Sequence, residues 1–335
     1  MDHSSRREFL KAVGLTGLAL GGCSRAQAPD TPVSAAPDPA EGRQTPRVVI
    51  ARLPGYDQGA DLDTDRLREA LERALMALTD AADASEAWRR YFGAEDIVAL
   101  KVNALAGPQL STHPELCHAA VAGLVAAGLD ENRIIVYDRL TEELEVLGFR
   151  PNHDGPGLKV LGSDVTGYDL EPTEVRAVGS CFSRIVSEIA TKIINVPVLK
   201  DHDLAGLSGA LKNHYGSINN PNKLHTDHCY PYVADLNCAG VLRSKQRLII
   251  CDALDVCYEG GPAFQPASTV PYGAVLVAED AVAADAVGLG ILDRLREEAG
   301  LPPLMSLERA PRYIKLAEEY GIGVAELHRI QIIEV

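Results

Sequence analysis

The sequence predicts an α/β protein whose mainly parallel sheet is covered by helices on both faces. Short runs rich in Val, Ile and Leu alternate along the chain with segments whose apolar residues recur every three or four positions. This alternation is typical of parallel sheets, because a crossover between two parallel strands needs a connection about as long as a helix. The chain has 335 residues, which is enough for one large domain or for two lobes.

The alternation of strands and helices begins at residue 47. Residues 64–78 place apolar side chains at the spacing of one helical face. A second helix is expected to open at Pro114, because proline is favoured in the first helical turn, and to end before Gly128. The elements expected before residue 150 are strands at 47–53, 96–102 and 133–138, and helices at 64–78, 114–127 and 141–147.

The second half of the domain repeats this alternation after an irregular segment. Residues 150–180 are rich in Gly and Pro and lack clear periodicity, so we expect an insertion or a lobe boundary there. A glycine-bearing helix is expected over 204–214, where helical spacing relates Leu204, Leu207, Leu211 and His214. The remaining expected elements are strands at 192–199, 247–252, 274–278 and 330–335, and helices at 281–298 and 311–320.

The first 46 residues resemble an export signal followed by a tether. The run SRREFLK at 5–11 resembles the twin-arginine export motif, and the apolar stretch after it is too short to span a bilayer. The Pro-rich segment 24–46 has the composition of a linker. We therefore expect the signal to occupy residues 1–23 and the α/β domain to occupy residues 47–335.

The end of this signal, LGGC at 20–23, resembles a lipoprotein cleavage box. In that interpretation Cys23 becomes the lipidated first residue. In the alternative, cleavage falls nearby and Cys23 is discarded or stays unmodified. The resemblance to export signals implies the twin-arginine translocase as a partner and a periplasmic or cell-envelope location, with membrane contact only through the lipid anchor.

Charge and cysteine spacing argue against several partners and cofactors. The net charge is −15 and no basic block follows the first residues, so no nucleic-acid partner is expected. None of the seven cysteines forms a C-x-x-C pair, so no intrinsic iron–sulfur cluster is expected. Most cysteines are expected to be small buried side chains rather than disulfides. The twin-arginine pathway carries folded proteins, many with cofactors, which leaves a bound metal or organic cofactor open.

Polar residues follow several of the predicted strands. The strand at 96–102 leads to Lys101 and Asn103 on one face, and the strand at 247–252 ends at Asp252. Open α/β sheets bind ligands at the carboxyl ends of their strands, where these side chains would meet. We therefore expect a site for a small anionic ligand, formed by Lys101, Asn103, His113, Asn213 and Asp252.

The segment LKDHDLAGLSGALKNHYGSINN gathers the candidate catalytic side chains, which are Lys200, His202, Lys212 and His214. Lysine and histidine both act as acids or bases when burial shifts their pKa values. His214 also falls on the apolar stripe of the predicted helix. It is therefore either a catalytic group or a hydrogen-bonded core histidine.

The run HTDHC at 225–229 adds two histidines at a spacing that metal ligands use on a helical turn. His202, His225 and His228 are accordingly candidate ligands for a divalent metal. The alternative is that they are uncoordinated polar residues of a loop.

Several pieces of the chain together resemble a known family. They are VALKVNALAGPQLSTHPELCHAAVAGLVAAGL, IIVYDR, NVPVLKDHDLAGLSGALKNHYGSI, and LIICDAL with a later GGP, and they are similar to domain-of-unknown-function family 362 over residues 96–289. The family is linked in places to ferredoxin modules, whose cysteines this chain lacks. The resemblance implies no reaction.

Two functional hypotheses follow. The first is an exported cell-envelope enzyme that acts on a small anionic molecule with Lys and His as acid–base groups, with or without a metal. The second is a tethered envelope binding protein or metal carrier that has the same pocket but no catalysis.

Overall fold

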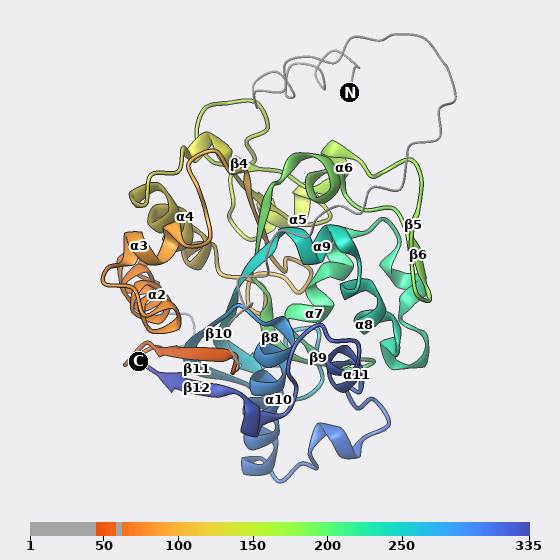
Figure 1. Ribbon diagram of the computed structural model, residues 1–335. Helices are drawn as coiled ribbons and strands as arrows, with labels where there is room; N and C mark the ends of the chain where they lie inside the picture. The colour runs from red at the N-terminus through yellow and green to blue at the C-terminus, as the bar shows by residue number, and fades with distance from the viewer. Residues whose placement is uncertain (1–44, 58–61) are drawn as a thin grey trace.

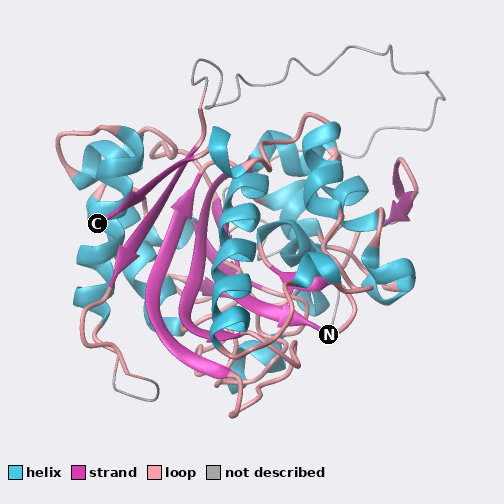
Figure 2. Ribbon diagram, turned by 90° about the horizontal axis from the view of Figure 1, so that it is seen from below, coloured by secondary structure: helices cyan, strands magenta, loops and turns pink. Residues whose placement is uncertain are grey.

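The computed structural model describes residues 45–57 and 62–335. The predicted export signal, Cys23 and nearly all of the predicted tether lie outside these residues. Within the described part, ten strands form one sheet in the order β12-β1-β11-β10-β7-β2-β3-β4, and β8 and β9 extend it beside β10. Figure 2 shows this sheet with helices on both sides.

The strands carry the apolar runs seen in the sequence. In chain order they are β1 (Arg47–Arg52), β2 (Val98–Lys101), β3 (Ile134–Tyr137), β4 (Lys159–Val160), β5 (Thr173–Val175), β6 (Val178–Ser180), β7 (Lys192–Asn195), β8 (Val198–His202), β9 (Gly206–Ser208), β10 (Gln246–Cys257), β11 (Thr269–Ala278) and β12 (Gln331–Glu334). The run from β10 through β7, β2 and β3 to β4 is parallel, whereas β11 is antiparallel to both β1 and β10. The prediction of a mainly parallel sheet is therefore confirmed.

The helices are α2 (Thr64–Thr79), α3 (Ala84–Arg89), α4 (Pro114–Ala126), α5 (Thr141–Val146), α6 (Ser163–Thr166), α7 (Ala210–Asn213), α8 (Tyr232–Asn237), α9 (Gly240–Lys245), α10 (Ala281–Glu298) and α11 (Tyr313–Glu319). Figure 1 places α2, α3 and α4 together, away from α7, α8 and α11. Four short helices, α3, α6, α8 and α9, have too few residues to show periodicity, and the sequence does not predict them.

Two apolar cores flank the sheet, because successive side chains of a strand point to opposite faces. Along β1, Val48 and Ile50 belong to one core, and Val49 and Ala51 belong to the other. The second core also contains the buried faces of α2, α3 and α4, and the first contains those of α7, α8, α10 and α11. Helices therefore cover both faces, as the sequence predicts.

The predicted helix over 204–214 is wrong. Its first half is strand β9, which pairs antiparallel with β8, and helix α7 begins only at Ala210. Gly206 has φ +74°, a left-handed conformation that breaks a right-handed helix, and its backbone lies directly against the Arg309 carbonyl. Gly209 also lies at a close approach, because a Cβ there would meet the Asp285 carboxylate.

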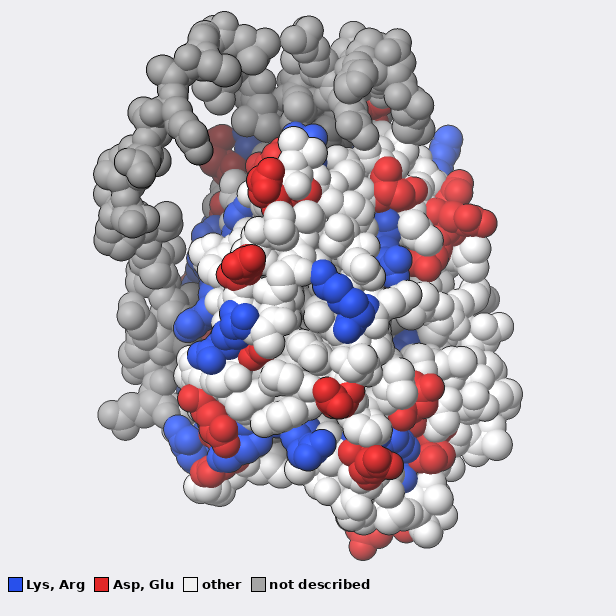
Figure 3. All heavy atoms as spheres, turned by 90° about the vertical axis from the view of Figure 1, so that its right-hand side faces the viewer, with Lys and Arg blue, Asp and Glu red and all other residues white. Residues whose placement is uncertain are grey.

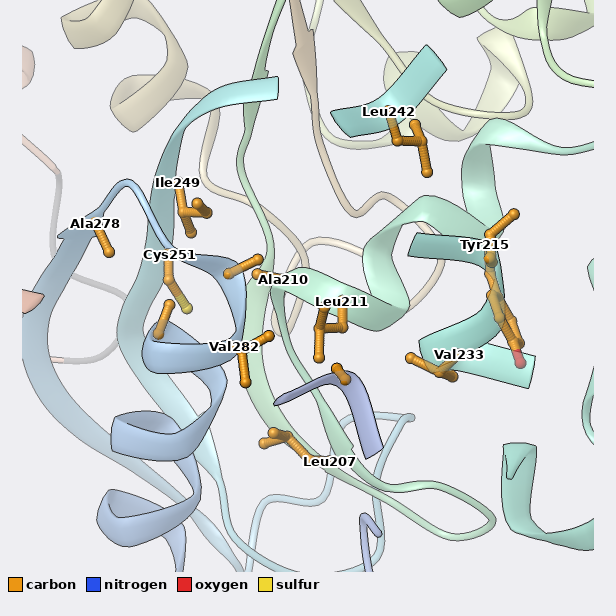
Figure 4. Close-up of a cluster of buried hydrophobic side chains, with 14 of the residues drawn as sticks. Leu207, Ala210, Leu211, Tyr215, Val233, Leu242, Ile249, Cys251, Ala278 and Val282 are labelled. Carbon is orange, nitrogen blue, oxygen red and sulfur yellow. The ribbon is translucent and has the colours of Figure 1, made fainter. Parts of the chain in front are cut away.

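Helix α7 is short but well anchored. Ala210 and Leu211 are buried in the first core, and Figure 4 shows them between Val282 of α10 and Val233 of α8. The backbone N–H groups of Ala210 and Leu211 also donate to the buried carboxylate of Asp285, at N···O distances of 2.6 and 3.0 Å. These contacts hold α7 in place, so that the residues after α7 are fixed at the edge of the sheet.

Three further features bear on the sequence predictions. The six cysteines within the described residues are free thiols, four of them buried. None of the described helices is long and apolar enough to cross a membrane. Residues 150–180 hold β4, α6 and the β5–β6 hairpin, and a lobe boundary there stays a prediction.

Candidate functional site

A cavity of about 430 Å³ opens at the carboxyl ends of β2, β3 and β8. Loops after these strands form one side, and α7 with the following 3-10 turns at His214–Ser217 and Pro221–Leu224 forms the other. Its charged and polar lining includes Lys101, Asn103, Asp138, Arg139, Glu143, His202, Asp203, Lys212, Asn213 and His225. The structure thus brings six of the sequence candidates, namely Lys101, Asn103, His202, Lys212, Asn213 and His225, to one cavity.

Lys101 is buried and its charge is already paired. Its Nζ lies 2.7 Å from Asp138 Oδ1, 2.5 Å from the Val102 carbonyl oxygen and 3.4 Å from Asn213 Oδ1. Burial lowers the pKa of Lys101, and the adjacent Asp138 carboxylate opposes that shift. Because these three contacts use all three N–H groups of its ammonium, Lys101 holds neighbouring residues of the cavity floor in place and is not a free cation.

Lys200 lies next to the cavity without lining it. Its Nζ donates to Asn103 Oδ1 at 3.0 Å and to the Leu110 carbonyl oxygen at 2.8 Å, and the side chain is buried. Burial, assisted by the positive charge of Lys212, lowers the pKa of Lys200 to about 7. Lys200 is therefore connected to the cavity through Asn103, whose amide oxygen it holds.

Lys212 projects from α7 into the cavity. Its Nζ lies 3.3 Å from His225 Nε2 and 4.8 Å from the centroid of the Tyr215 ring. No carboxylate of residues 45–57 or 62–335 lies within ion-pair distance of this ammonium. Burial lowers the pKa of Lys212 to about 8.

The proton of His202 can be placed from its contacts. Nδ1 accepts hydrogen bonds from the backbone N–H groups of Leu204 and Ala205, at 3.1 and 3.3 Å. Burial and the charges of Lys212 and its neighbours lower the pKa of His202 to about 2, so the ring is neutral near pH 7. Asp203 Oδ1 lies 3.0 Å from Nδ1 but makes no hydrogen bond with it. The ring proton is therefore on Nε2, which is a hydrogen-bond donor.

His225 has the opposite arrangement. Its Nδ1 lies 3.1 Å from the Pro221 carbonyl oxygen, which can only accept, so the ring proton is on Nδ1. Its Nε2 therefore presents a lone pair to Lys212. Burial, with the nearby Lys212 charge, lowers the pKa of His225. The His202 and His225 rings stack with centroids 5.9 Å apart and an interplanar angle of 28°.

Four sequence candidates lie away from the cavity. His214 is fully buried, with Nε2 2.7 Å from Gln246 Oε1 and Nδ1 3.2 Å from Ser217 Oγ, as a hydrogen-bonded core histidine. His113 and Asp252 contact each other, at 2.8 Å between Nδ1 and Oδ2. Asp252 lies inside the long strand β10 rather than at its end, which corrects the strand boundary at 252. His228 does not line the cavity and bonds the Leu204 carbonyl oxygen.

The predicted set of metal ligands is not assembled. Within the described residues, no three His, Cys, Asp or Glu side chains gather in a way that could hold a metal ion. His202 and His225 are neighbours, but the Nδ1 atoms of both already bond the backbone.

Four charged residues of the lining were not among the candidate site residues, namely Asp138, Arg139, Glu143 and Asp203. Arg139 and Glu143 follow β3, and Asp203 follows β8. The strand-end rule that places Lys101 at the edge of the sheet also places Asp138 and Arg139 there, but the sequence alone assigned neither residue a role in the site. The Nε of Arg139 is a buried donor that has no hydrogen-bond partner within the described part of the chain.

Comparisons with known proteins give a family and a distant structural likeness. The family model described as "Domain of unknown function (DUF362)" matches residues 98–290. No curated protein matches the chain. A structural genomics crystal structure of a protein from Thermotoga maritima is similar with a TM-score of 0.41 and 12% identity, over 79% of this chain. The match spans 61% of the length of that protein.

Proposed function

This chain belongs to the DUF362 family, and we propose that it is an enzyme that binds a small anionic carbonyl compound and moves a proton next to the carbonyl group. The observation that carries the proposal is the stacked pair of His202 and His225 with opposite proton positions. One ring offers a donor and the other offers a lone pair within the same cavity.

The two rings suit different steps of proton transfer. A neutral imidazole N–H stabilises negative charge that develops on a carbonyl oxygen, because it donates a hydrogen bond without losing its proton. His202 Nε2 supplies that donor. The lone pair of His225 Nε2 accepts a proton from the carbon next to the carbonyl.

Arg139 and Lys212 support an anionic ligand. Lys101 is neutralised by Asp138, so among the described residues these two side chains are the lining cations with capacity left for a carboxylate. The unpartnered Nε of Arg139 is a donor of the kind that a carboxylate oxygen satisfies. On the face seen in Figure 3, basic and acidic residues are interspersed. That face therefore has no patch of basic residues alone that would attract an anion.

Deuterium exchange tests this function. Purified protein is incubated with pyruvate in D2O, and loss of the methyl protons is followed by NMR. We expect exchange above the buffer rate, and His225→Gln should reduce it by roughly 100-fold, the usual size of a general-base contribution. His228→Gln is the matched control, because His228 lies in the same loop region but outside the cavity.

The outcomes separate the two hypotheses. Equal exchange in both histidine variants would contradict the assigned base. Calorimetric binding of pyruvate without any exchange in the unaltered protein would favour the binding protein without catalysis.

We further propose that the chain is exported through the twin-arginine translocase to the cell envelope, with Cys23 as the lipid attachment point. The support is the run SRREFLK followed by LGGC. Replacing Arg6 and Arg7 with Lys should leave the protein in the cytoplasmic fraction. Cys23→Ser should release the exported protein from the membrane fraction, and unchanged fractionation of either variant would contradict the corresponding part.

A further inference from the structure

Three lysines surround the cavity, and their amino groups differ in what they contact. Lys101 is paired with Asp138, and Lys200 is held by Asn103 and the Leu110 carbonyl behind the wall. Lys212 lines the cavity and contacts the lone pair of His225 instead of a carboxylate. Only an amine with this last arrangement can both reach a ligand and give up its extra proton without breaking an ion pair.

The surroundings of Lys212 are suited to nucleophilic attack. The neighbouring Tyr215 ring stacks edge-on against His225, with centroids 5.3 Å apart, and fixes the imidazole that faces the amine. The His202 ring stacks on the His225 ring, and its Nε2–H has no hydrogen-bond partner within the described residues. An amine, a proton acceptor and a hydrogen-bond donor thus share one cavity wall.

We propose that Lys212 forms a Schiff base with the carbonyl group of the ligand. This step rests on the proposed function, because it requires a ligand with an aldehyde or ketone. The chemistry extends that function from proton transfer alone to covalent catalysis, in which the protonated imine acts as an electron sink.

The step balances without a further reactant. His225 Nε2 takes one proton from the Lys212 ammonium, and the free amine attacks the carbonyl carbon, so that a C–N bond forms and the carbonyl π electrons move to oxygen. A proton passes from nitrogen to that oxygen. His225 then returns its proton to the hydroxyl group, the C–O bond breaks, water leaves, and the nitrogen lone pair completes the C=N bond. His202 donates a hydrogen bond to the oxygen throughout and keeps its proton.

The acidity of Lys212 agrees with this role. Burial lowers its pKa to about 8, so a sizeable fraction of the amine is neutral at physiological pH. Lys200 also has a lowered pKa, but it does not line the cavity.

Reductive trapping tests the proposal. The full-length protein is treated with glyoxylate and sodium cyanoborohydride, which reduces an imine to carboxymethyl-lysine, and the modified residue is identified by peptide mass spectrometry. We expect modification of Lys212 at least ~10-fold faster than of exposed lysines, since a desolvated amine of lowered pKa is the better nucleophile near neutral pH. Lys212→Arg should lose this fast modification. Lys223→Arg is the matched control, because Lys223 is exposed and outside the cavity.

Peptide mass spectrometry of the unaltered protein tests the proposal without requiring any variant to fold. Fast labelling confined to Lys212 supports the Schiff base. If pyruvate exchanges its protons but glyoxylate labels Lys212 no faster than Lys223, the Schiff base is overturned and the proposed function stands. If pyruvate neither binds nor exchanges and labelling is also unselective, both are overturned.

Discussion

His113 keeps a positive charge at a pH at which an ordinary histidine is neutral. Its Nδ1 lies 2.8 Å from Asp252 Oδ2, and its Nε2 lies 3.6 Å from Asp255 Oδ2. Burial by itself would lower the pKa of His113, but the two carboxylates outweigh it and raise the pKa to about 10. The Tyr56 hydroxyl donates to the same Asp255 oxygen at 2.8 Å, so the cluster also ties the loop after β1 to β10.

This cluster predicts a pH dependence of stability. The folded-state pKa of His113 is above its unfolded value of about 6.5, so its contribution is fully present below pH 6.5 and is lost as pH rises through about 10. We expect the unfolding free energy of the unaltered protein to exceed that of His113→Gln by roughly 2 kcal/mol at pH 6, and the two to converge near pH 10. Urea unfolding at pH 6, 8 and 10 measures this difference.

A histidine on the surface is the control for that titration. His328 has a side chain 76% exposed, beside Glu326. Because this contact is exposed, His328→Gln should change the unfolding free energy by less than about 1 kcal/mol in the same measurements. A stability difference for His113→Gln that stays the same at every pH would contradict the charged His113.

The sequence predicted which residue types meet at the carboxyl edge of the sheet, but not which of them form ion pairs or hydrogen bonds with one another. Lys101, Asn103 and His202 reach one cavity because parallel strands end at one edge, a rule that needs only the strand pattern. Pairing depends on distances between segments far apart in the chain. Asp138 neutralises Lys101 from the next strand, and the Pro221 carbonyl sets the proton of His225. Neither contact leaves a signal in local composition.

At the scale of elements, long periodic segments were predictable and short ones were not. The helix over 64–78 and the strands at 96–102 and 133–138 match α2, β2 and β3 closely, because each buries a regular apolar face. Residues 204–214 show a helical spacing that is accidental. There, pairing of β9 with β8 and the positive φ of Gly206 override the local pattern.

The turn after α7 depends on close approach to the sheet. Cβ at Gly216 would lie 2.5 Å from Lys101 Nζ and from Asp138 Oδ1, so the 3-10 turn rests on the buried ion pair. We expect Gly216→Ala to destabilise the protein by about 1–3 kcal/mol, the usual cost of overpacking, and to weaken pyruvate binding. Thermal unfolding and calorimetry measure the two effects.

Gly240 provides the comparison for this substitution. It is the first residue of α9, and a Cβ there would meet nothing within 4 Å. Gly240→Ala should be neutral or slightly stabilising, since alanine restricts the unfolded chain. A Gly216→Ala protein as stable as Gly240→Ala would show that the turn can move away from the ion pair.

At the scale of the whole molecule, the C-terminal part of the domain contacts both the first strand of the domain and the edge of the sheet beside the cavity. Strand β12 pairs in parallel with β1, so the last strand lies beside the first strand of the domain. The segment between α10 and α11 reaches the carboxyl end of β8 through Arg309. The Arg309 guanidinium contacts the Asp201 carboxylate and lies 2.9 Å from Glu259 Oε2. This connection holds β8, whose last residue is His202, against a segment about 100 positions later.

Loss of the Arg309 connection should therefore destabilise the fold as a unit. Asp201 is fully buried, and burial raises the pKa of its carboxyl group, whereas Arg309 favours the charged form. Removing Arg309 leaves a buried acid without its cation, so we expect Arg309→Met to lower the unfolding free energy by about 3–5 kcal/mol. Adding Asp201→Asn to this variant removes the unpaired buried charge and should recover part of the lost unfolding free energy. Arg329→Met, which breaks an exposed pair with Glu318, should cost less than about 1 kcal/mol. Urea unfolding of the unaltered protein and the three variants measures these differences. If Arg309→Met loses no more unfolding free energy than Arg329→Met, the buried pair does not hold the C-terminal segment to β8. A double variant as unstable as Arg309→Met alone would show the same.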